Sequence, residues 1–383
     1  MKTLLINSSF GFGSSANANL ASDLSESVAA SGQSIEVLCA AVSLCTRPIV
    51  GVTVIKMPER FQCKTWSLTK LNFLLFAIAF LLVSGRKYHR IICMDDPQGL
   101  PIVLHYLRRL HWITCRIFLW QLDLAFVQRK TFYEKKFGKR LSAVLFSQLL
   151  ESLNRVDSIV VMGKCMQTLL ESLGVDSNLI VVIPPWPSIS VSNNVFRTVP
   201  SSVFRILYSG HLGEWHDIEA IQQLLLKCRS INCHFTFQAV GQGIAQLRSF
   251  SATNDLNNIS FQELAPHNSV GRALQESDAH LVSLRSSCLG TSVPSKTYAA
   301  MASSRPIIFL GPNACQAAID IATADAGIVG DSNDLARVVV LLMDWIEDRT
   351  IAYRKGQAGY TWFAANRSMR VATLKWVALL NQA

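Results

Sequence analysis

Short apolar runs alternate with helix-length segments along the whole chain. This alternation is typical of α/β folds built on parallel sheets. The pattern therefore predicts two doubly wound α/β domains. The predicted strands are Thr3–Asn7, Ser34–Cys39, Arg90–Met94, Thr114–Trp120, Ser158–Met162, Leu179–Ile183, Arg205–Tyr208, His234–Ala239, Ile259–Phe261, Ala279–Leu284, Pro306–Phe309 and Gly327–Val329. The predicted helices include Ala16–Ala30, Glu219–Arg229, Ser269–Glu276, Ser295–Ala302 and Asn333–Trp345.

The character of the chain changes where three prolines surround Trp186 and a polar stretch follows. Such a composition is typical of a linker. We therefore expect an N-terminal domain over residues 1–188, a linker over 189–202 and a C-terminal domain over 203–355. The mostly helical segment 356–383 is expected, by analogy with other two-domain proteins, to cross back onto the N-terminal domain. Since α/β sheets bind ligands at the carboxyl ends of their strands, we expect a ligand cleft between the domains.

The segment Leu71–Val83 is apolar throughout but shorter than the ~20 residues needed to span a bilayer. We favour a buried or strongly amphipathic helix here. The alternative is a helix that lies in a membrane interface, because lysines and arginines flank the segment on both sides. The first ten residues are typical of a buried first strand and not of a secretory signal.

Charge is concentrated in the first half of the 383-residue chain, whose formal net charge is +10. Residues 1–190 hold 20 basic and 12 acidic side chains. A basic half indicates an anionic partner such as a membrane surface, a diphosphate or nucleic acid. No nucleic-acid-binding motif supports the last class. The ten cysteines form no C-x-x-C pair, so a zinc or dithiol site is not indicated and a reducing cytoplasmic setting fits best.

Two glycine-bearing loops follow predicted strands. The first, Ser8–Ser15, contains Gly11 and Gly13 and precedes a helix, so its backbone N–H groups could cradle a phosphate. It lacks the third glycine of a dinucleotide-binding site, and an ordinary tight turn is the alternative. The second, Tyr208–Asp217, combines two glycines with two histidines and predicts an anion cradle, the alternative being a surface loop.

A third segment, Leu289–Ile308, carries Lys296 in the first turn of a predicted helix that begins after Pro294. A lysine there opposes the helix macrodipole, which costs a few tenths of a kcal/mol unless an anion binds. The segment therefore indicates an anion site, and a solvated lysine is the alternative.

Two features of the N-terminal half offer further chemistry. Asp123 follows the strand Thr114–Trp120, where it serves either the reacting centre or a helix cap. The segment Gln128–Arg140 interleaves aromatic with basic side chains, which suits an anionic membrane or a lipid-diphosphate acceptor, or else a solvated helix face. Its basic residues are Arg129, Lys130, Lys135, Lys136, Lys139 and Arg140.

These segments together resemble glycosyltransferase family 4, the retaining GT-B enzymes. The stretch V-P-S-K-T-Y…M-A-S-S-R-P-I-I around Lys296 is similar to the family's donor-site signature. The loop Y-S-G-H-L-G-E-W-H-D resembles that of the exopolysaccharide, colanic-acid-type branch, and I-P-P-W at 183–186 resembles its interdomain element. The resemblance covers nearly the whole chain in order.

The resemblance implies two Rossmann-like domains, a nucleotide-sugar held by the C-terminal domain and an acceptor on the basic N-terminal domain. Catalysis would depend on positioning and on stabilising the leaving diphosphate. We expect Asp123 and Lys296 to be catalytic and no metal ion or other cofactor to be needed. The expected donor-binding residues are Gly11, Gly13, Gly210, His211, Gly213, Glu214, His216, Thr291, Ser295, Lys296 and Tyr298.

The sequence departs from the family pattern at the ribose-binding glutamate, whose position holds Ala299. His211 and His216 stand roughly where many members place arginine and lysine, so we expect donor affinity to weaken as the pH rises. The predicted function is a surface-glycan transferase on the cytoplasmic face of the plasma membrane. The alternatives are a GT-B-fold sugar-nucleotide epimerase, which would need paired carboxylates, and a degenerate, non-catalytic scaffold.

Overall fold

The computed structural model describes residues 1–12, 15–43, 48–63, 65–94, 96–187, 202–266 and 269–382. The chain divides into two compact units, described here separately. Unit 1 comprises Met1–Ser188 with Met369–Ala383, and unit 2 comprises Ile189–Ser368. The expected linker falls largely on residues 188–201, and Gly13 also lies outside the described residues.

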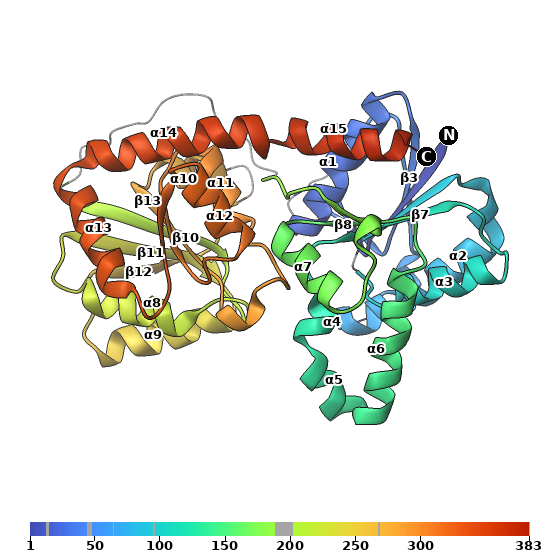
Figure 1. The fold of residues 1–383 in the computed structure, drawn as a ribbon, viewed down its shortest axis with the longest axis horizontal. Helices are drawn as coiled ribbons and strands as arrows, with labels where there is room; N and C mark the ends of the chain where they lie inside the picture. The colour runs from blue at the N-terminus through green and yellow to red at the C-terminus, as the bar shows by residue number, and fades with distance from the viewer. Residues whose placement is uncertain are drawn as a thin grey trace. The chain divides into compact units, whose positions relative to one another are not determined.

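Unit 1 is built on a parallel sheet whose described strands have the order β5-β3-β1-β6-β7-β8-β9 (Figure 1). Its strands are β1 (Lys2–Ile6), β2 (Ser9–Phe10), β3 (Ser34–Cys39), β4 (Ala41–Val42), β5 (Val52–Lys56), β6 (Arg90–Met94), β7 (Arg116–Gln121), β8 (Ser158–Val161) and β9 (Ile180–Val182). Its helices are α1 (Ala16–Ala30), α2 (Trp66–Ser84), α3 (Leu100–Arg109), α4 (Ala125–Gln128), α5 (Lys130–Phe137), α6 (Lys139–Leu153), α7 (Lys164–Ser172) and α15 (Met369–Asn381).

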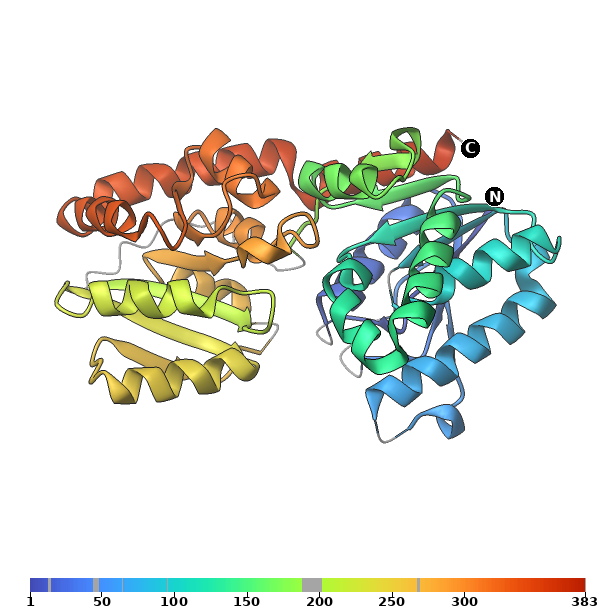
Figure 2. The same ribbon diagram turned by 60° about the horizontal axis from the view of Figure 1, so that its bottom comes forward.

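Unit 2 repeats the architecture, with the described strand order β12-β11-β10-β13-β14-β15 and helices on both faces of the sheet (Figures 1 and 2). Its strands are β10 (Phe204–His211), β11 (Cys233–Val240), β12 (Ile259–Gln262), β13 (Ala279–Ser283), β14 (Ile307–Leu310) and β15 (Gly327–Gly330). Its helices are α8 (Ile218–Lys227), α9 (Gln242–Thr253), α10 (Val270–Gln275), α11 (Lys296–Ala302), α12 (Gln316–Thr323), α13 (Leu335–Glu347) and α14 (Arg349–Asn366).

Each strand predicted from the sequence overlaps a strand of the structure. The prediction missed the edge strand β5, whose residues are half-buried or exposed, and the two-residue strands β2 and β4. In each sheet the chain first adds strands on one side of the first strand and later crosses to its other side. As a result, β1 lies between β3 and β6, and β10 lies between β11 and β13. Such topological switch points are where open α/β sheets bind ligands.

The C-terminal segment differs from the expectation at its start. Residue 356 lies inside α14, whose Gly356 approaches the backbone of Ser304 in unit 2 so closely that a Cβ would meet its carbonyl oxygen at 2.3 Å. The segment up to Ser368 therefore stays with unit 2, and only α15 belongs to unit 1.

Two tryptophans hold α15 and the exit of the chain in the core of unit 1. The Trp376 ring of α15 meets Trp120 of β7 edge-on at 4.9 Å between ring centroids, and Trp186 stacks on Trp120 at 5.6 Å. The Trp186 indole N–H donates to Asp23 of α1 at 2.9 Å. The I-P-P-W element is thus a buried anchor of unit 1.

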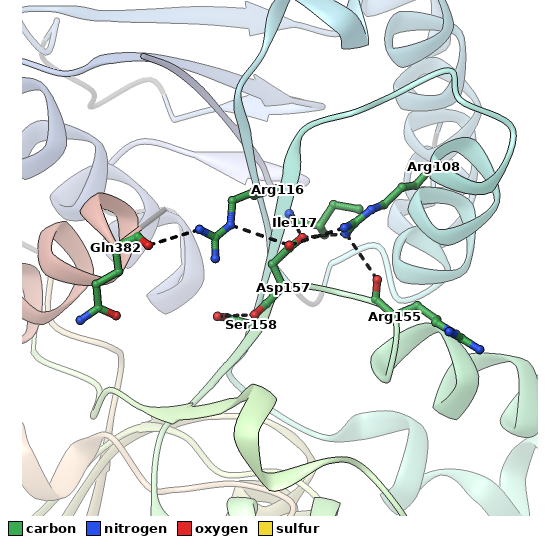
Figure 3. Close-up of polar contacts among 7 residues, drawn as sticks. All are labelled: Arg108, Arg116, Ile117, Arg155, Asp157, Ser158 and Gln382. Atoms are coloured by element: carbon green, nitrogen blue, oxygen red, sulfur yellow. Dashed lines mark hydrogen bonds and ion pairs between the residues drawn. The ribbon is translucent and has the colours of Figure 1, made fainter.

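At the other end of β7, the carboxylate of Asp157 holds several elements of unit 1 together, as Figure 3 shows. Asp157, just before β8, accepts hydrogen bonds from the Ile117 backbone N–H at 2.9 Å and from Arg108 of α3 at 2.6 Å. Arg116 lies 3.7 Å from the same carboxylate and donates to the carbonyl of Gln382 at 3.5 Å. Asp157 therefore links α3, β7, β8 and the end of α15.

Helix α2 is longer than expected and less buried. Together with the turn after it, Trp66–Lys87, it is long and apolar enough to cross a membrane by length and composition among the described residues. The strands on either side of it in sequence, β5 and β6, belong to one parallel sheet, so α2 is a crossover helix lying on unit 1. Only Thr69, Phe73, Ala77 and Leu81 are buried, which contradicts a fully buried helix.

Candidate active site

The site in unit 2 begins where β10 ends. Gly210 has a φ of 108°, and a Cβ there would lie 2.9 Å from Cε of Lys296. Gly213 is packed against the His211 ring, which a Cβ would meet at 2.4 Å. Gly241, after β11, has a φ of 112° and approaches the same ring. These glycines let the His211 ring and the Lys296 side chain lie directly against the backbone.

Lys296, at the start of α11, donates three hydrogen bonds to β10 and the loop after it. Its Nζ lies 3.0 Å from the Tyr208 hydroxyl, 2.6 Å from the carbonyl oxygen of His211 and 3.3 Å from Nε2 of His216. Nδ1 of His216 lies 2.9 Å from the carbonyl oxygen of Ser283. Since a carbonyl only accepts, Nδ1 carries the proton of the neutral ring and Nε2 accepts from Lys296.

A row of aromatic rings supports this cluster from one face of the sheet. Phe261, Phe237 and Tyr208 are cross-strand neighbours on β12, β11 and β10, and they stack at 5.8 and 5.7 Å between ring centroids. The ring of His216 meets Tyr208 edge-on at 5.8 Å. The Tyr208 hydroxyl, which donates to the His211 carbonyl at 3.0 Å, is thereby held in place to accept from Lys296.

Burial sets the protonation states in the cluster. Desolvation lowers the pKa of Lys296 to about 7. Desolvation and the neighbouring Lys296 charge lower the pKa of His216 to about 3, and the same two causes lower the pKa of His211. The histidines are therefore neutral near pH 7 in the free protein, and Lys296 is the group that titrates there. This changes our expectation that the histidines would carry the pH dependence.

The cluster is built to receive an anion. The three acceptors around Lys296 are neutral, and within the described residues no carboxylate lies within ion-pair distance of it. The buried Gly213 also has a backbone N–H with no acceptor among those residues. A half-buried ammonium and a free N–H, both without an anionic partner, favour a negatively charged ligand.

The other predicted donor-site residues of unit 2 have different surroundings. Glu214 is exposed, and Ser295 is the half-buried N-cap of α11. The Thr291 hydroxyl is buried and donates to the Cys288 carbonyl at 2.8 Å. Tyr298 departs most from the prediction, because its buried hydroxyl donates to Asp320 at 2.8 Å. Its side chain is part of the core, where it is shielded from a ligand.

Asp320 is the centre of a buried network that sequence reasoning missed. Both of its carboxylate oxygens accept from Arg367, at 2.8 and 2.9 Å, and it also accepts from Gln316 at 2.9 Å. The network joins α11, α12 and the end of α14. Since Tyr298 lies two residues after Lys296, Asp320 helps fix the helix that carries the site lysine.

The site residues predicted in unit 1 are spread over separate elements. Gly11 has a φ of 101° and its N–H donates to Ser22 of α1 at 3.0 Å. Asp123 is half-buried beyond the carboxyl end of β7. The N-cap of α4 is Leu124, so Asp123 is not its capping residue. The six basic residues of the Gln128–Arg140 segment are all exposed on the hairpin formed by α5 and α6, which projects from unit 1 in Figure 1.

A pocket of about 480 Å³ lies at the switch point of unit 1, where sequence reasoning had placed only the glycine loop. Segments after β1, β3 and β6 meet α1 and α2 there. Its lining residues are Ser9, Ser15, Asn17, Ala41, Val42, Ser43, Trp66, Lys70 and Asp96. Ser9 and Ser15 belong to the glycine loop that was marked in the sequence, and tertiary contacts bring residues of α1, of the segment Ala41–Ser43, of α2 and of the segment after β6 to it.

No protein-family model matches the chain. Among curated proteins, WcaI of Escherichia coli (strain K12), named as a colanic acid biosynthesis glycosyl transferase, is 24% identical over 154 residues. The alignment spans 38% of this chain and 38% of that protein, so the chain matches well under half of this relative's length.

Solved structures match over nearly the full chain. Sucrose-phosphate synthase from Thermosynechococcus elongatus has a TM-score of 0.75 at 12% identity, covering 100% of this chain and 99% of that one. Anabaena HepE in complex with UDP-glucose has a TM-score of 0.71 at 15% identity, covering 100% of both chains. WaaG, a glycosyltransferase involved in lipopolysaccharide biosynthesis, has a TM-score of 0.71 at 12% identity, covering 99% of both. The predicted α/β GT-B fold and the resemblance to GT-B glycosyltransferases are thus confirmed.

Proposed function

We propose that this protein is a retaining glycosyltransferase that moves a sugar, of hexosyl type, from a nucleotide-sugar to a lipid-linked or polysaccharide acceptor in surface-glycan biosynthesis. The observation that carries the proposal is the Lys296 cluster at the switch point of unit 2, a cationic site that has no anionic partner among the described residues of a GT-B fold. The colanic acid name of the curated relative supports the exopolysaccharide context.

The donor is held through its diphosphate. The Lys296 ammonium and the Gly213 N–H supply positive charge and a hydrogen-bond donor at the β10 loop, and the exposed His211 ring packs against Gly213. Solved structures of HepE contain UDP and UDP-glucose, so a uridine diphosphate sugar is the first donor to test. Ala299 leaves the ribose without the glutamate contact of the family.

In the proposed reaction the bond between the anomeric carbon and the diphosphate oxygen breaks, and its electron pair stays with the diphosphate. The acceptor hydroxyl oxygen forms the new bond to the same carbon, and its proton passes to the departing phosphate oxygen. Lys296 stabilises the charge that develops on the leaving group. The half-buried Asp123 carboxylate would orient the acceptor, and the reaction calls for no resident metal ion.

The acceptor side of the proposal depends on unit 1. The α5–α6 hairpin exposes six basic side chains beside the exposed apolar residues Phe132, Leu141, Val144 and Leu145. This combination favours binding to an anionic membrane surface, so we place the enzyme at the cytoplasmic face of the plasma membrane. Changing Lys135, Lys136 and Lys139 together to alanine should reduce co-sedimentation with anionic vesicles. Unchanged sedimentation would contradict this placement.

The donor site is tested by ligand-dependent thermal stabilisation with UDP, GDP, ADP and their sugars. A ligand at a hundred times its dissociation constant adds about 2.7 kcal/mol of stability. We expect a shift with one nucleotide class that is lost in Lys296→Ala and kept in Lys227→Ala, an exposed lysine of α8. Absence of a shift with every nucleotide would refute the donor site.

A degenerate, non-catalytic scaffold is the second candidate, favoured by Ala299 at the position of the ribose-binding glutamate. Both candidates predict nucleotide binding, so turnover separates them. Release of UDP from a bound UDP-sugar in the presence of acceptor lipids would support the transferase. Nucleotide binding without any release would favour the scaffold.

A further inference from the structure

Two arginines lie side by side at the amino end of the unit 1 sheet, the end opposite to the pocket described above. Arg90 is the first residue of β6 and Arg116 is the first residue of β7, and the two are register partners in the pairing of these parallel strands. Residues in register on neighbouring strands project from the same face of a sheet, so the two side chains are neighbours. Like charges in such a position destabilise the sheet unless an anion lies between them.

Arg90 is a buried cation without a carboxylate partner. The residue is 3% exposed, and among the described residues no acidic side chain lies within ion-pair distance of it. Its guanidinium donates to the amide oxygen of Gln33 at 2.8 Å and to Sδ of Met1 at 2.9 Å, and its buried Nε has no hydrogen-bond acceptor. A thioether is a weak acceptor, and Met1 is 70% exposed, so an anion can displace it. A buried charge that lacks a counter-charge is costly, so Arg90 favours an anionic ligand.

The neighbouring groups leave the positive charge in excess. Arg116 lies 3.7 Å from the carboxylate of Asp157 and 3.5 Å from the carbonyl of Gln382, both longer than a good hydrogen bond (Figure 3). Asp157 is held more closely by Arg108, at 2.6 Å. Burial lowers the pKa of Arg90, and the nearby charge of Arg116 lowers it further, but a guanidinium stays charged near neutral pH. Three arginines therefore share one carboxylate.

We propose that the Arg90–Arg116 pair is a binding site for a phosphate group. The excess of two positive charges favours a dianion over a monovalent carboxylate. Guanidinium groups present forked N–H donors that match the oxygens of a phosphate. The proposal is independent of the proposed function, because the Lys296 site belongs to unit 2 and this pair belongs to unit 1.

A phosphate group in this position would fasten helix α15. Arg116 already reaches the carbonyl of Gln382, and the Gln33 amide that accepts from Arg90 donates to Asn381 at 3.2 Å. Both Asn381 and Gln382 lie at the end of α15, the part of unit 1 that follows unit 2 in the chain. The competing interpretation is that the arginines only neutralise the negative end of the α15 dipole. That interpretation needs no ligand, so the two are separable by experiment.

Binding is tested by titration calorimetry of the full chain with inorganic phosphate at about pH 8, where phosphate is mostly a dianion. All variants carry Lys296→Ala, so that the anion site of unit 2 does not contribute. We expect phosphate to bind, and Arg90→Met and Arg116→Gln each to weaken binding at least about tenfold, because each removes charge-assisted hydrogen bonds. The matched control is Arg109→Gln, an exposed arginine at the end of α3. Absence of phosphate binding, or binding that neither variant weakens, would overturn the proposal.

The source of the phosphate group is tested in the same assay with glycerol 3-phosphate. Tighter binding of the ester than of inorganic phosphate would support the site and identify an organic phosphate as its ligand. The opposite order would support the site with free phosphate as its ligand.

Unfolding in phosphate-free buffer separates ligand binding from a structural role. Arg90→Met removes a buried charge and keeps an unbranched apolar side chain, so its unfolding temperature should equal or exceed that of the chain with Arg90. Added phosphate should raise the unfolding temperature of the Arg90 chain and leave that of Arg90→Met unchanged. A lower unfolding temperature of Arg90→Met, with the same response to phosphate as the Arg90 chain, would show that Arg90 only supports the fold and would refute the site.

Discussion

Binding of a nucleotide-sugar should weaken as the pH rises, because one lysine in the site is half-charged near neutrality. Burial lowers the pKa of Lys296 to about 7, so the ammonium predominates below that pH and the neutral amine above it. A bound diphosphate stabilises the ammonium and raises its pKa. Binding above pH 7 therefore takes up a proton, and affinity falls with increasing pH until the bound-state pKa is passed.

The magnitude follows from the charged fraction of the free protein. Between pH 6 and pH 8 that fraction falls from about 0.9 to about 0.1, so the dissociation constant should rise about tenfold. The assay is titration calorimetry with UDP-glucose. UDP itself is unsuitable because a terminal phosphate titrates with a pKa of about 6.

Two variants identify the titrating group. Lys296→Arg keeps its charge throughout this range and should flatten the pH profile. His211→Gln should leave the tenfold change intact, because desolvation and the Lys296 charge lower the pKa of His211 and so disfavour its charged form. A dissociation constant that stays within about twofold from pH 6 to pH 8 would refute the reasoning. So would a pH dependence that survives Lys296→Arg and disappears in His211→Gln.

Three further substitutions test the support of the site. Gly210→Ala should cost about 1 kcal/mol or more of stability in urea unfolding and weaken donor binding, because φ is 108° and the new Cβ would press on Lys296. Tyr208→Phe removes an acceptor from the ammonium, so the midpoint of the pH profile should move down by about one unit with the fold intact by circular dichroism. Asp320→Asn breaks the buried pair with Arg367 and should destabilise the chain by about 3–5 kcal/mol in the same unfolding assay. A stability equal to that of the unaltered chain would contradict the predictions for Gly210→Ala and Asp320→Asn. An unchanged midpoint of the pH profile would contradict the prediction for Tyr208→Phe.

The local sequence pattern was sufficient to predict the buried strands and to single out the segments that carry Lys296 and His216. Apolar runs marked the buried strands because a parallel sheet covered on both faces buries nearly every side chain. The edge strand β5 and helix α6 were not predicted as elements, and most of their residues are half-buried or exposed in the structure. Gly210 and Gly213 were visible in the sequence. That Lys296 and His211 pack against them, which requires glycine there, was seen only in the structure.

Protonation and pocket formation were decided by contacts between distant segments. From the sequence, His211 and His216 were expected to be the cations of the site, and Tyr298 was expected to contact the nucleotide-sugar. The structure desolvates both histidines beside Lys296 and buries Tyr298 against Asp320. Desolvation depends on everything that surrounds a group, so no local window of sequence can report it.

The sequence by itself determined the alternation of strands and helices, the two-unit organisation and the family resemblance, because these follow from short-range periodicity and local motifs. Only the tertiary structure decided that Lys296 is held by three neutral acceptors and that five separate segments enclose a pocket beside Trp66. The physical reason is the strand order. Placing β1 between β3 and β6, and β10 between β11 and β13, brings together loops that lie far apart along the chain.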